Sequence, residues 1–174
     1  MEEVAEAAGV TKPVLYQHFE SKRALYQELL EDVGTRLLTA VATAAAPPCG
    51  REREHEGLAA YFGFLFENSS AFRLLFGASV RNDPEFAEVA EGVLNRLADM
   101  VAPLITFEVS EEHRQVIAHA LVGVAEAVGR RALFDENAEH DPEVLARWTT
   151  EMAWFGLRGV FQHESEVTVG LRES

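Results

Sequence analysis

The sequence predicts an all-α protein. Helix start and stop signals divide its 174 residues into eight segments, and most segments carry apolar residues at three- and four-residue steps. No stretch shows the alternation of apolar and polar residues that marks a half-buried strand. Hydrophobic residues make up 48% of the chain and charged residues 25%, as in globular proteins that bury a core.

Two short helices are expected at the N-terminus. The first covers residues 2–8 and ends at Gly9, because glycine readily takes the left-handed conformation that closes a helix. Thr11 is a candidate cap for the second helix, which tolerates Pro13 in its first turn and runs to about residue 18. The pair is joined by only a few residues, so the turn between the helices is tight.

A third, long helix follows, for which Ser21 is the candidate cap. It ends before residues 47–50, a linker by its proline and glycine content. Its apolar positions recur at helical spacing and predict one buried face. These positions are Tyr26, Leu30, Val33, Leu37 and Val41.

Five further helices complete the chain. They are expected at residues 51–68, 70–77, 84–104, 111–133 and 142–162. The helix at 51–68 is apolar on nearly all sides, which is typical of a central helix. Asp83 and Asp141 each precede a proline. In each pair the aspartate is the expected N-cap and the proline the first residue of the helix. Pro103 disturbs a last turn, and residues 163–174 are expected to fray.

Composition limits the setting and the chemistry. The acidic start lacks the basic region of a signal peptide, and the longest nearly apolar run, residues 57–66, is about half of a bilayer-spanning helix. The single cysteine, Cys49, cannot form an internal disulfide, so we expect a cytoplasmic protein. The sequence has no phosphate-binding glycine loop, nucleophile elbow or pair of catalytic carboxylates, which predicts no enzyme, cofactor or metal.

Charge is distributed unevenly along the chain. Fifteen Lys and Arg against 29 Asp and Glu give a formal net charge of -14, which repels nucleic acid at long range. Residues 11–23 nevertheless carry Lys12, Lys22 and Arg23 against one acid, Glu20. The acidic average therefore predicts weak non-specific binding without excluding a small basic contact surface.

The first two helices suit a helix-turn-helix arrangement, whose second helix enters the major groove of DNA. Ala5 supplies the small residue needed where the helices cross, and Gly9 supplies the turn. The inward face consists of Val4, Ala8, Val10, Leu15 and Phe19. The outward face of the second helix shows Lys12, Val14, Gln17 and His18.

Residues 4–25 as a block closely resemble the DNA-binding signature of tetracycline-repressor-like (TetR-family) transcriptional regulators. The matching residues include Ala5, Ala8, Gly9, Val10, Leu15, Tyr16, Phe19, Lys22 and Leu25. The resemblance implies a dimeric, one-component repressor that binds a palindromic operator and is released by a small ligand. Residues 1–33 would form the DNA-binding head, and residues 34–174 would bind ligand and dimerise. Family members normally carry a further helix before this pair, so the resemblance predicts a head that is incomplete at its N-terminus.

The resemblance also implies the roles of individual head residues. Base edges would be faced by Lys12, Pro13, Val14 and Gln17, and phosphates held by Thr11, Tyr16, His18 and Lys22. Side-chain chemistry agrees, because lysine donates to guanine, glutamine pairs with adenine and valine touches the thymine methyl. Hydroxyl and imidazole groups donate to phosphates, and helix N-terminal amides attract them. The alternatives are a core aromatic for Tyr16 and a solvated charge for Lys22.

Two helices near the C-terminus carry apolar stripes at helical spacing. The stripes fit either an intramolecular core or a four-helix interface between two copies, as the TetR resemblance implies. For the interface we expect Ala118, Val122, Ala125, Gly129, Leu145, Trp148, Met152 and Phe155.

Eleven phenylalanines, concentrated in the middle of the chain, exceed what a small core needs. We expect some of them to line a ligand pocket, at Phe62, Phe66, Phe76 and Phe86. Few cations stand among them, which favours a small apolar effector such as a lipid-like or acyl-chain compound. The alternative is a helical small-molecule-binding or interaction protein that no longer binds DNA.

Overall fold

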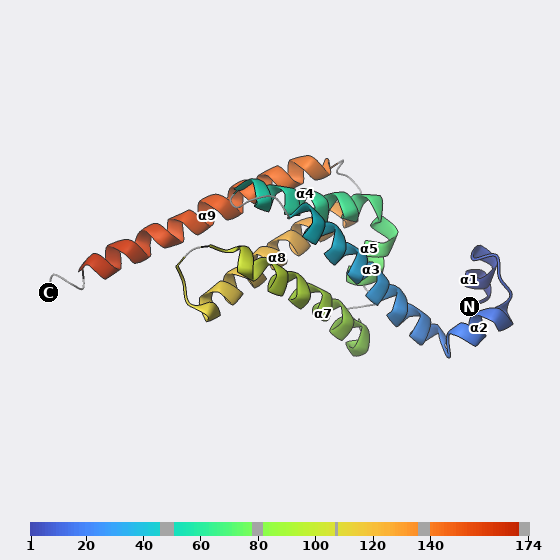
Figure 1. Ribbon diagram of the computed structural model, residues 1–174. Coiled ribbons are helices and arrows are strands. Elements are labelled where there is room, and N and C mark those ends of the chain that lie inside the picture. Colours follow the sequence, from blue (N-terminus) through green and yellow to red (C-terminus); the bar gives the residue numbers. More distant parts are fainter. Residues whose placement is uncertain (46–50, 78–81, 107, 136–139, 171–174) are drawn as a thin grey trace.

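A computed structural model gives the arrangement of the chain (Figure 1). It describes all residues except 46–50, 78–81, 107, 136–139 and 171–174, and of residues 74–76 and 157–170 it describes only the backbone. The described residues form helices and no strand, so the predicted fold class is confirmed. Within them, no helix is long and apolar enough to cross a membrane. The linker with Cys49 lies outside the described residues.

The helices begin and end close to their predicted positions. They are α1 (Glu2–Ala7), α2 (Lys12–His18), α3 (Lys22–Ala44), α4 (Arg51–Glu67), α5 (Ser69–Phe76), α7 (Pro84–Val101), the 3₁₀ helix η1 (Ala102–Leu104), α8 (Glu111–Phe134) and α9 (Pro142–Gly170). Gly9 has the left-handed backbone expected after α1, with φ +67°. The Ser21 hydroxyl caps α3 by accepting from the Ala24 amide at 3.0 Å.

The last helix is longer than predicted. The sequence predicts fraying over residues 163–174, whereas α9 continues to Gly170; residues 171–174 lie outside the described residues. The segment from His163 to Val169 contains neither proline nor glycine, so nothing in its sequence interrupts the hydrogen-bond ladder before Gly170. In Figure 1, this part of α9 extends away from the other helices.

The core lies around α4, which packs against α3, α5, α8 and α9. Its largest fully buried side chains are Phe62, Phe72, Leu30, Leu37 and Leu65. Each such side chain stabilises the fold by roughly 1.5–3 kcal/mol relative to an exposed position. The prediction that α4 is central is confirmed.

A second, smaller cluster lies at the far end of α3, where α1 and α2 are located (Figure 1). Its buried members are Ala5, Leu15 and Leu25, with Met1 and Phe19 packed against them. The predicted inward face is thus right for Leu15 and Phe19 and wrong for Val4, Ala8 and Val10, whose side chains are exposed. Leu25 belongs to this cluster and Leu30 to the large core, so α3 is shared between the two.

Helix α3 packs against α7. The guanidinium of Arg23 forms 2.8 Å hydrogen bonds to both carboxylate oxygens of Asp83 and a 2.7 Å hydrogen bond to Glu85. Farther along, a Cβ at Gly34 would lie 2.4 Å from Val93 Cγ2, so the glycine permits a close approach of the helices. Charge at one end and close packing in the middle therefore join α3 to α7.

Candidate functional site

The eight residues expected to contact DNA all have exposed side chains. They are Thr11, Lys12, Pro13, Val14, Tyr16, Gln17, His18 and Lys22. Leu15 is buried in the small cluster, which fixes the outward face of α2. Tyr16 is 47% exposed, so the core alternative does not apply to it. Thr11 occupies the N-cap of α2, but its hydroxyl makes no cap hydrogen bond.

Two basic side chains near this surface lie beside carboxylates. Lys12 Nζ is 3.9 Å from an oxygen of Glu2, and both groups are well exposed. An exposed pair of this kind contributes about 0–1 kcal/mol and yields readily to another anion. Arg23 instead binds Asp83, which holds the pKa of the Asp83 carboxyl below its usual range by hydrogen bonding. The sequence did not identify Arg23 as a bridge between helices.

The small stripe expected at a dimer interface lies inside the single chain. Ala118, Val122, Ala125 and Gly129 of α8 are buried. A Cβ at Gly129 would lie 2.9 Å from Leu65 Cδ2, so the stripe faces α4. Buried residues offer no surface to a second copy, and the intramolecular interpretation is therefore the right one for this stripe.

The α9 residues of the predicted interface divide into two groups. Leu145 is 7% exposed and belongs to the large core. Trp148, Met152 and Phe155 are 58%, 54% and 63% exposed. Their spacing places them on one side of α9, and large apolar side chains at such exposure leave an apolar face uncovered.

The phenylalanine pocket is not where we expected it. Phe62 is fully buried in the large core, and Phe66 packs against that core. The ring of Phe86 on α7 contacts that of Tyr26 on α3, with 4.4 Å between the ring centroids. The side chain of Phe76 lies outside the described residues. Phe62, Phe66 and Phe86 therefore contribute to packing between helices, and none of them lines the cavity described next.

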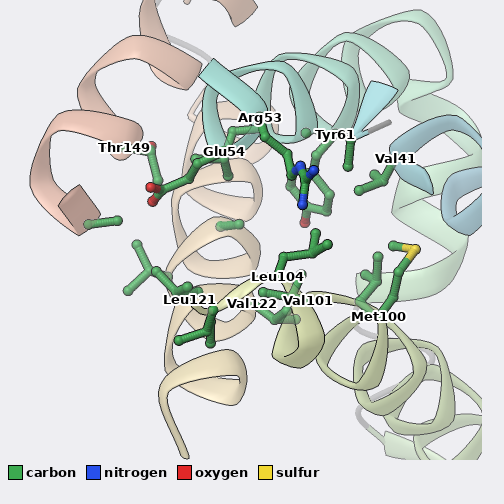
Figure 2. A pocket seen from close by; sticks show the side chains of 18 of the residues that line it. Val41, Arg53, Glu54, Tyr61, Met100, Val101, Leu104, Leu121, Val122 and Thr149 are labelled. Carbon is green, nitrogen blue, oxygen red and sulfur yellow. The ribbon is translucent and has the colours of Figure 1, made fainter. Parts of the chain in front are cut away.

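A cavity of about 220 Å³ lies elsewhere, between the C-terminal halves of α3 and α7 and the helices α4, η1, α8 and α9 (Figure 2). Its wall is mainly aliphatic. The apolar lining includes Val41, Leu58, Leu97, Met100, Val101, Leu104, Ile105, Leu121, Val122 and Trp154. The volume is below the roughly 300–1,000 Å³ of sites for drug-sized ligands, which favours a slim occupant.

Polar groups reach this cavity from α4 and α9. Glu54 Oε1 and the Tyr61 hydroxyl are buried and have no hydrogen-bond partner among the described residues. Burial raises the pKa of Glu54 to about 7, although Arg51 acts in the opposite direction. Arg53 and Thr149 also line the cavity. No feature of the sequence identifies these polar groups as buried, because acidic and basic residues at the start of a helix usually face solvent.

A helix-turn-helix pair placed on a larger helical body is the arrangement of a DNA-binding transcriptional regulator. The family model described as "Bacterial regulatory proteins, tetR family" matches residues 1–29. The HTH-type transcriptional activator FasR of Mycolicibacterium smegmatis is 32% identical over 163 residues, which cover 92% of this chain and 74% of FasR. The regulator BetI of Cronobacter sakazakii is 25% identical, over 94% of this chain and 83% of BetI.

Solved structures have the same fold. The TetR-family regulator PfmR of Thermus thermophilus has a TM-score of 0.69 at 18% identity, covering 88% of this chain and 86% of PfmR. A TetR-family regulatory protein from Rhodococcus has a TM-score of 0.67 at 17% identity, covering 88% of this chain and 83% of its own. The chain belongs to the TetR family of bacterial regulatory proteins. It is a transcriptional regulator and not an enzyme.

Proposed function

We propose that this regulator binds a palindromic operator as a dimer in its ligand-free state and releases it when a small apolar compound enters the cavity. The observation that carries the proposal is the outward face of α2, where side chains that read bases and side chains that hold phosphates are exposed together. The head would comprise residues 1–33 and the ligand and dimer region residues 34–174.

On DNA, α2 would lie in the major groove. Lys12, Val14 and Gln17 would face base edges together with Pro13. Thr11, Tyr16, His18 and Lys22 would hold phosphates, for which the exposed hydroxyls and imidazole supply donors. The α3 N-terminus adds backbone amides next to Lys22, and amides at a helix start attract anions.

The ligand would act on the head through α3 and α7. Val41 on α3 and Met100 on α7 both line the cavity, near the C-terminal ends of these helices. Arg23 joins the opposite ends of the same two helices, one residue after Lys22. A ligand that separates α3 from α7 at the cavity would therefore turn Lys22 and α2 relative to the operator. Its effect on DNA affinity is limited to its differential affinity for the two states.

For the dimer we propose a face of α8 next to the buried stripe. Val116, Ala120, Gly123 and Ala127 are exposed and follow one another at steps of four, three and four residues. Small apolar side chains of this kind allow two helices to approach closely. Trp148, Met152 and Phe155 of α9 would extend the apolar contact. The acidic net charge does not oppose such a contact, because this face of α8 carries few charges.

Selection of bound fragments from random DNA, followed by affinity measurements at several salt concentrations, tests the DNA contacts. We expect Gln17→Ala to relax the preference at one base pair, with about 1–3 kcal/mol of discrimination lost. Lys22→Ala should instead lower the affinity for all DNA sequences by a similar factor and reduce the salt dependence of binding. An unchanged sequence preference in Gln17→Ala would contradict the proposed orientation of α2.

A reporter gene behind the selected operator measures the direction of control. Release by ligand predicts repression, so deletion of the regulator should raise expression. FasR of Mycolicibacterium smegmatis is named an activator, and a fall in expression on deletion would align this chain with that name. If no operator emerges from selection, the alternative of a helical binding protein without DNA contact replaces the proposal.

A further inference from the structure

The cavity contains polar groups that its apolar wall leaves unsatisfied. Glu54 Oε1 is shielded from solvent and lacks a hydrogen-bond partner among the described residues, and so does the hydroxyl of Tyr61. Tyr61 is 4% exposed, so water at the molecular surface does not reach it freely. Buried polar groups that stay unpaired destabilise the fold, and an occupant that pairs with them recovers that free energy.

The positions of the two groups define the shape of the occupant. Glu54 and Tyr61 are seven residues apart on α4, which places them about 10 Å apart along one side of the helix. In Figure 2 the carboxyl group of Glu54 points toward Thr149 of α9. The Tyr61 side chain points from α4 toward Leu104. The carboxyl group therefore lies at one end of the cavity, and aliphatic side chains line most of the remainder.

Charge favours a cation at the carboxyl end. An ammonium group would donate to Glu54 Oε1, which is shielded from the surface solvent, and would neutralise the carboxylate. The formal net charge of -14 also raises the local concentration of cations and lowers that of anions. A fatty carboxylate would be repelled by ionised Glu54 and by the net charge of the whole protein, and Arg53 is the cation of the lining that would attract it.

We propose that the effector of this regulator is a cationic amphiphile, a slim alkyl compound whose ammonium group pairs with Glu54 and whose chain fills the aliphatic part of the cavity. This inference rests on the proposed function and revises its ligand: the chain stays apolar, and a cationic head group is added to it. Burial keeps Glu54 partly protonated in the empty cavity, and an ammonium group would lower its pKa and complete its ionisation. Tyr61 remains available to donate to an acceptor farther along the ligand.

Three probes that differ only in the head group test the proposal: decylamine, decan-1-ol and decanoate. Their dissociation constants are measured by calorimetry on the full chain, with thermal shifts as a second readout. We expect decylamine to bind at least tenfold more tightly than decan-1-ol, and decanoate to bind most weakly. In Glu54→Gln the dissociation constant of decylamine should rise at least tenfold, while that of decan-1-ol stays within twofold. The matched control is Glu52→Gln, an exposed residue of the same helix that does not line this cavity.

Other results would overturn the inference in distinguishable ways. Equal affinities for the three probes would leave an apolar cavity without head-group selection, so the proposed function would stand and the inference would fail. Tightest binding of decanoate would assign the head-group contact to Arg53, which also lines the cavity. A preference for decylamine that survives in Glu54→Gln would locate the cation elsewhere. If none of the three probes binds, the apolar effector class of the proposed function fails as well.

Discussion

The head and the body of this regulator differ in how much apolar surface holds them together. The body, by which we mean the helices packed around α4, buries a continuous cluster that extends from Leu30 of α3 to Ala146 of α9. The last residues of the proposed head, from Leu30 to Val33, therefore already pack in the body. In the head, the cluster consists of Ala5, Leu15 and Leu25, with two partly buried side chains. Stability in small units scales with the apolar area removed from water, so the described head depends on few contacts.

This difference indicates where the molecule can change shape at low cost. A region with few buried contacts opens at a lower free energy than a densely packed one. The body therefore acts as the stable element that holds the cavity, and the head follows α3. Four substitutions test this contrast, in order of decreasing effect.

Phe62→Ala should have the largest effect, because it removes a fully buried aromatic ring from the centre of the body. We expect a loss of about 3–5 kcal/mol in the free energy of unfolding. Urea unfolding followed by circular dichroism measures it. A loss below 1 kcal/mol would mean that α4 does not carry the core.

Leu15→Ala should act on the head and leave the body intact. Removing a buried leucine costs about 2–5 kcal/mol, which is a large share of what a cluster with two buried leucines supplies, so α1 and α2 should lose amide protection. Hydrogen exchange should remain slow from Leu30 onward. Equal loss of protection in both regions would show that they unfold as one unit and would break the contrast.

Gly129→Leu should destabilise the body by about 1–3 kcal/mol, because the new side chain would collide with Leu65 and Tyr61 of α4. The matched control is Gly123→Leu on the same helix, where an added Cβ meets nothing within 4 Å in the single chain. Gly123→Leu should keep the stability of the subunit and weaken the dimer, which sedimentation measures. A stable dimer in Gly123→Leu would remove this face from the interface.

Glu54→Gln should have the smallest effect, and one that depends on pH. Burial raises the pKa of Glu54 to about 7 in the folded state, whereas an unfolded glutamate titrates near 4.5. The carboxyl is protonated in both states at low pH, and its ionisation destabilises the fold as the pH rises from about 4.5 through 7. Glutamine stays neutral, so the variant should gain on the order of 1 kcal/mol over the unmodified protein at pH 8, after allowance for partial exposure.

Urea unfolding of both proteins at pH 4.5, 6 and 8 measures this difference, with Glu52→Gln as the control. The gain should be absent at pH 4.5 and grow with pH. A gain that is equal at all three values would point to packing instead of charge at Glu54.

Local features of the sequence predicted most of the fold. A cap or a helix-breaking residue determines where its own helix begins or ends. The structure has helix boundaries at the places predicted from Gly9, Ser21 and Pro103. The exposed face of α2 also follows from a short stretch, because Leu15 alone fixes which side turns inward. Neither inference needs knowledge of distant residues.

The cavity, and the exposed face of α8 that we propose for the dimer, depend on which helix packs against which face. Spacing alone does not determine that packing. The stripe at Ala118 and Gly129 and the exposed face at Ala120 and Gly123 have the same periodicity and similar residues. Only the packing of α4 against α8 distinguishes them. Glu54 was missed for a related reason, because α9 and η1 cover a helix start that would otherwise be solvated.

Because α3 joins the body to the head, a small tilt of this helix near the cavity produces a larger displacement at the head. Its 23 residues make a rod of about 35 Å, with the cavity near one end and the head at the other. A tilt of roughly 5° about the cavity end would displace the head by about 3 Å, comparable to the length of a hydrogen bond. In the proposed mechanism, a modest rearrangement around a slim ligand would therefore move α2 too far to keep its contacts in a DNA groove.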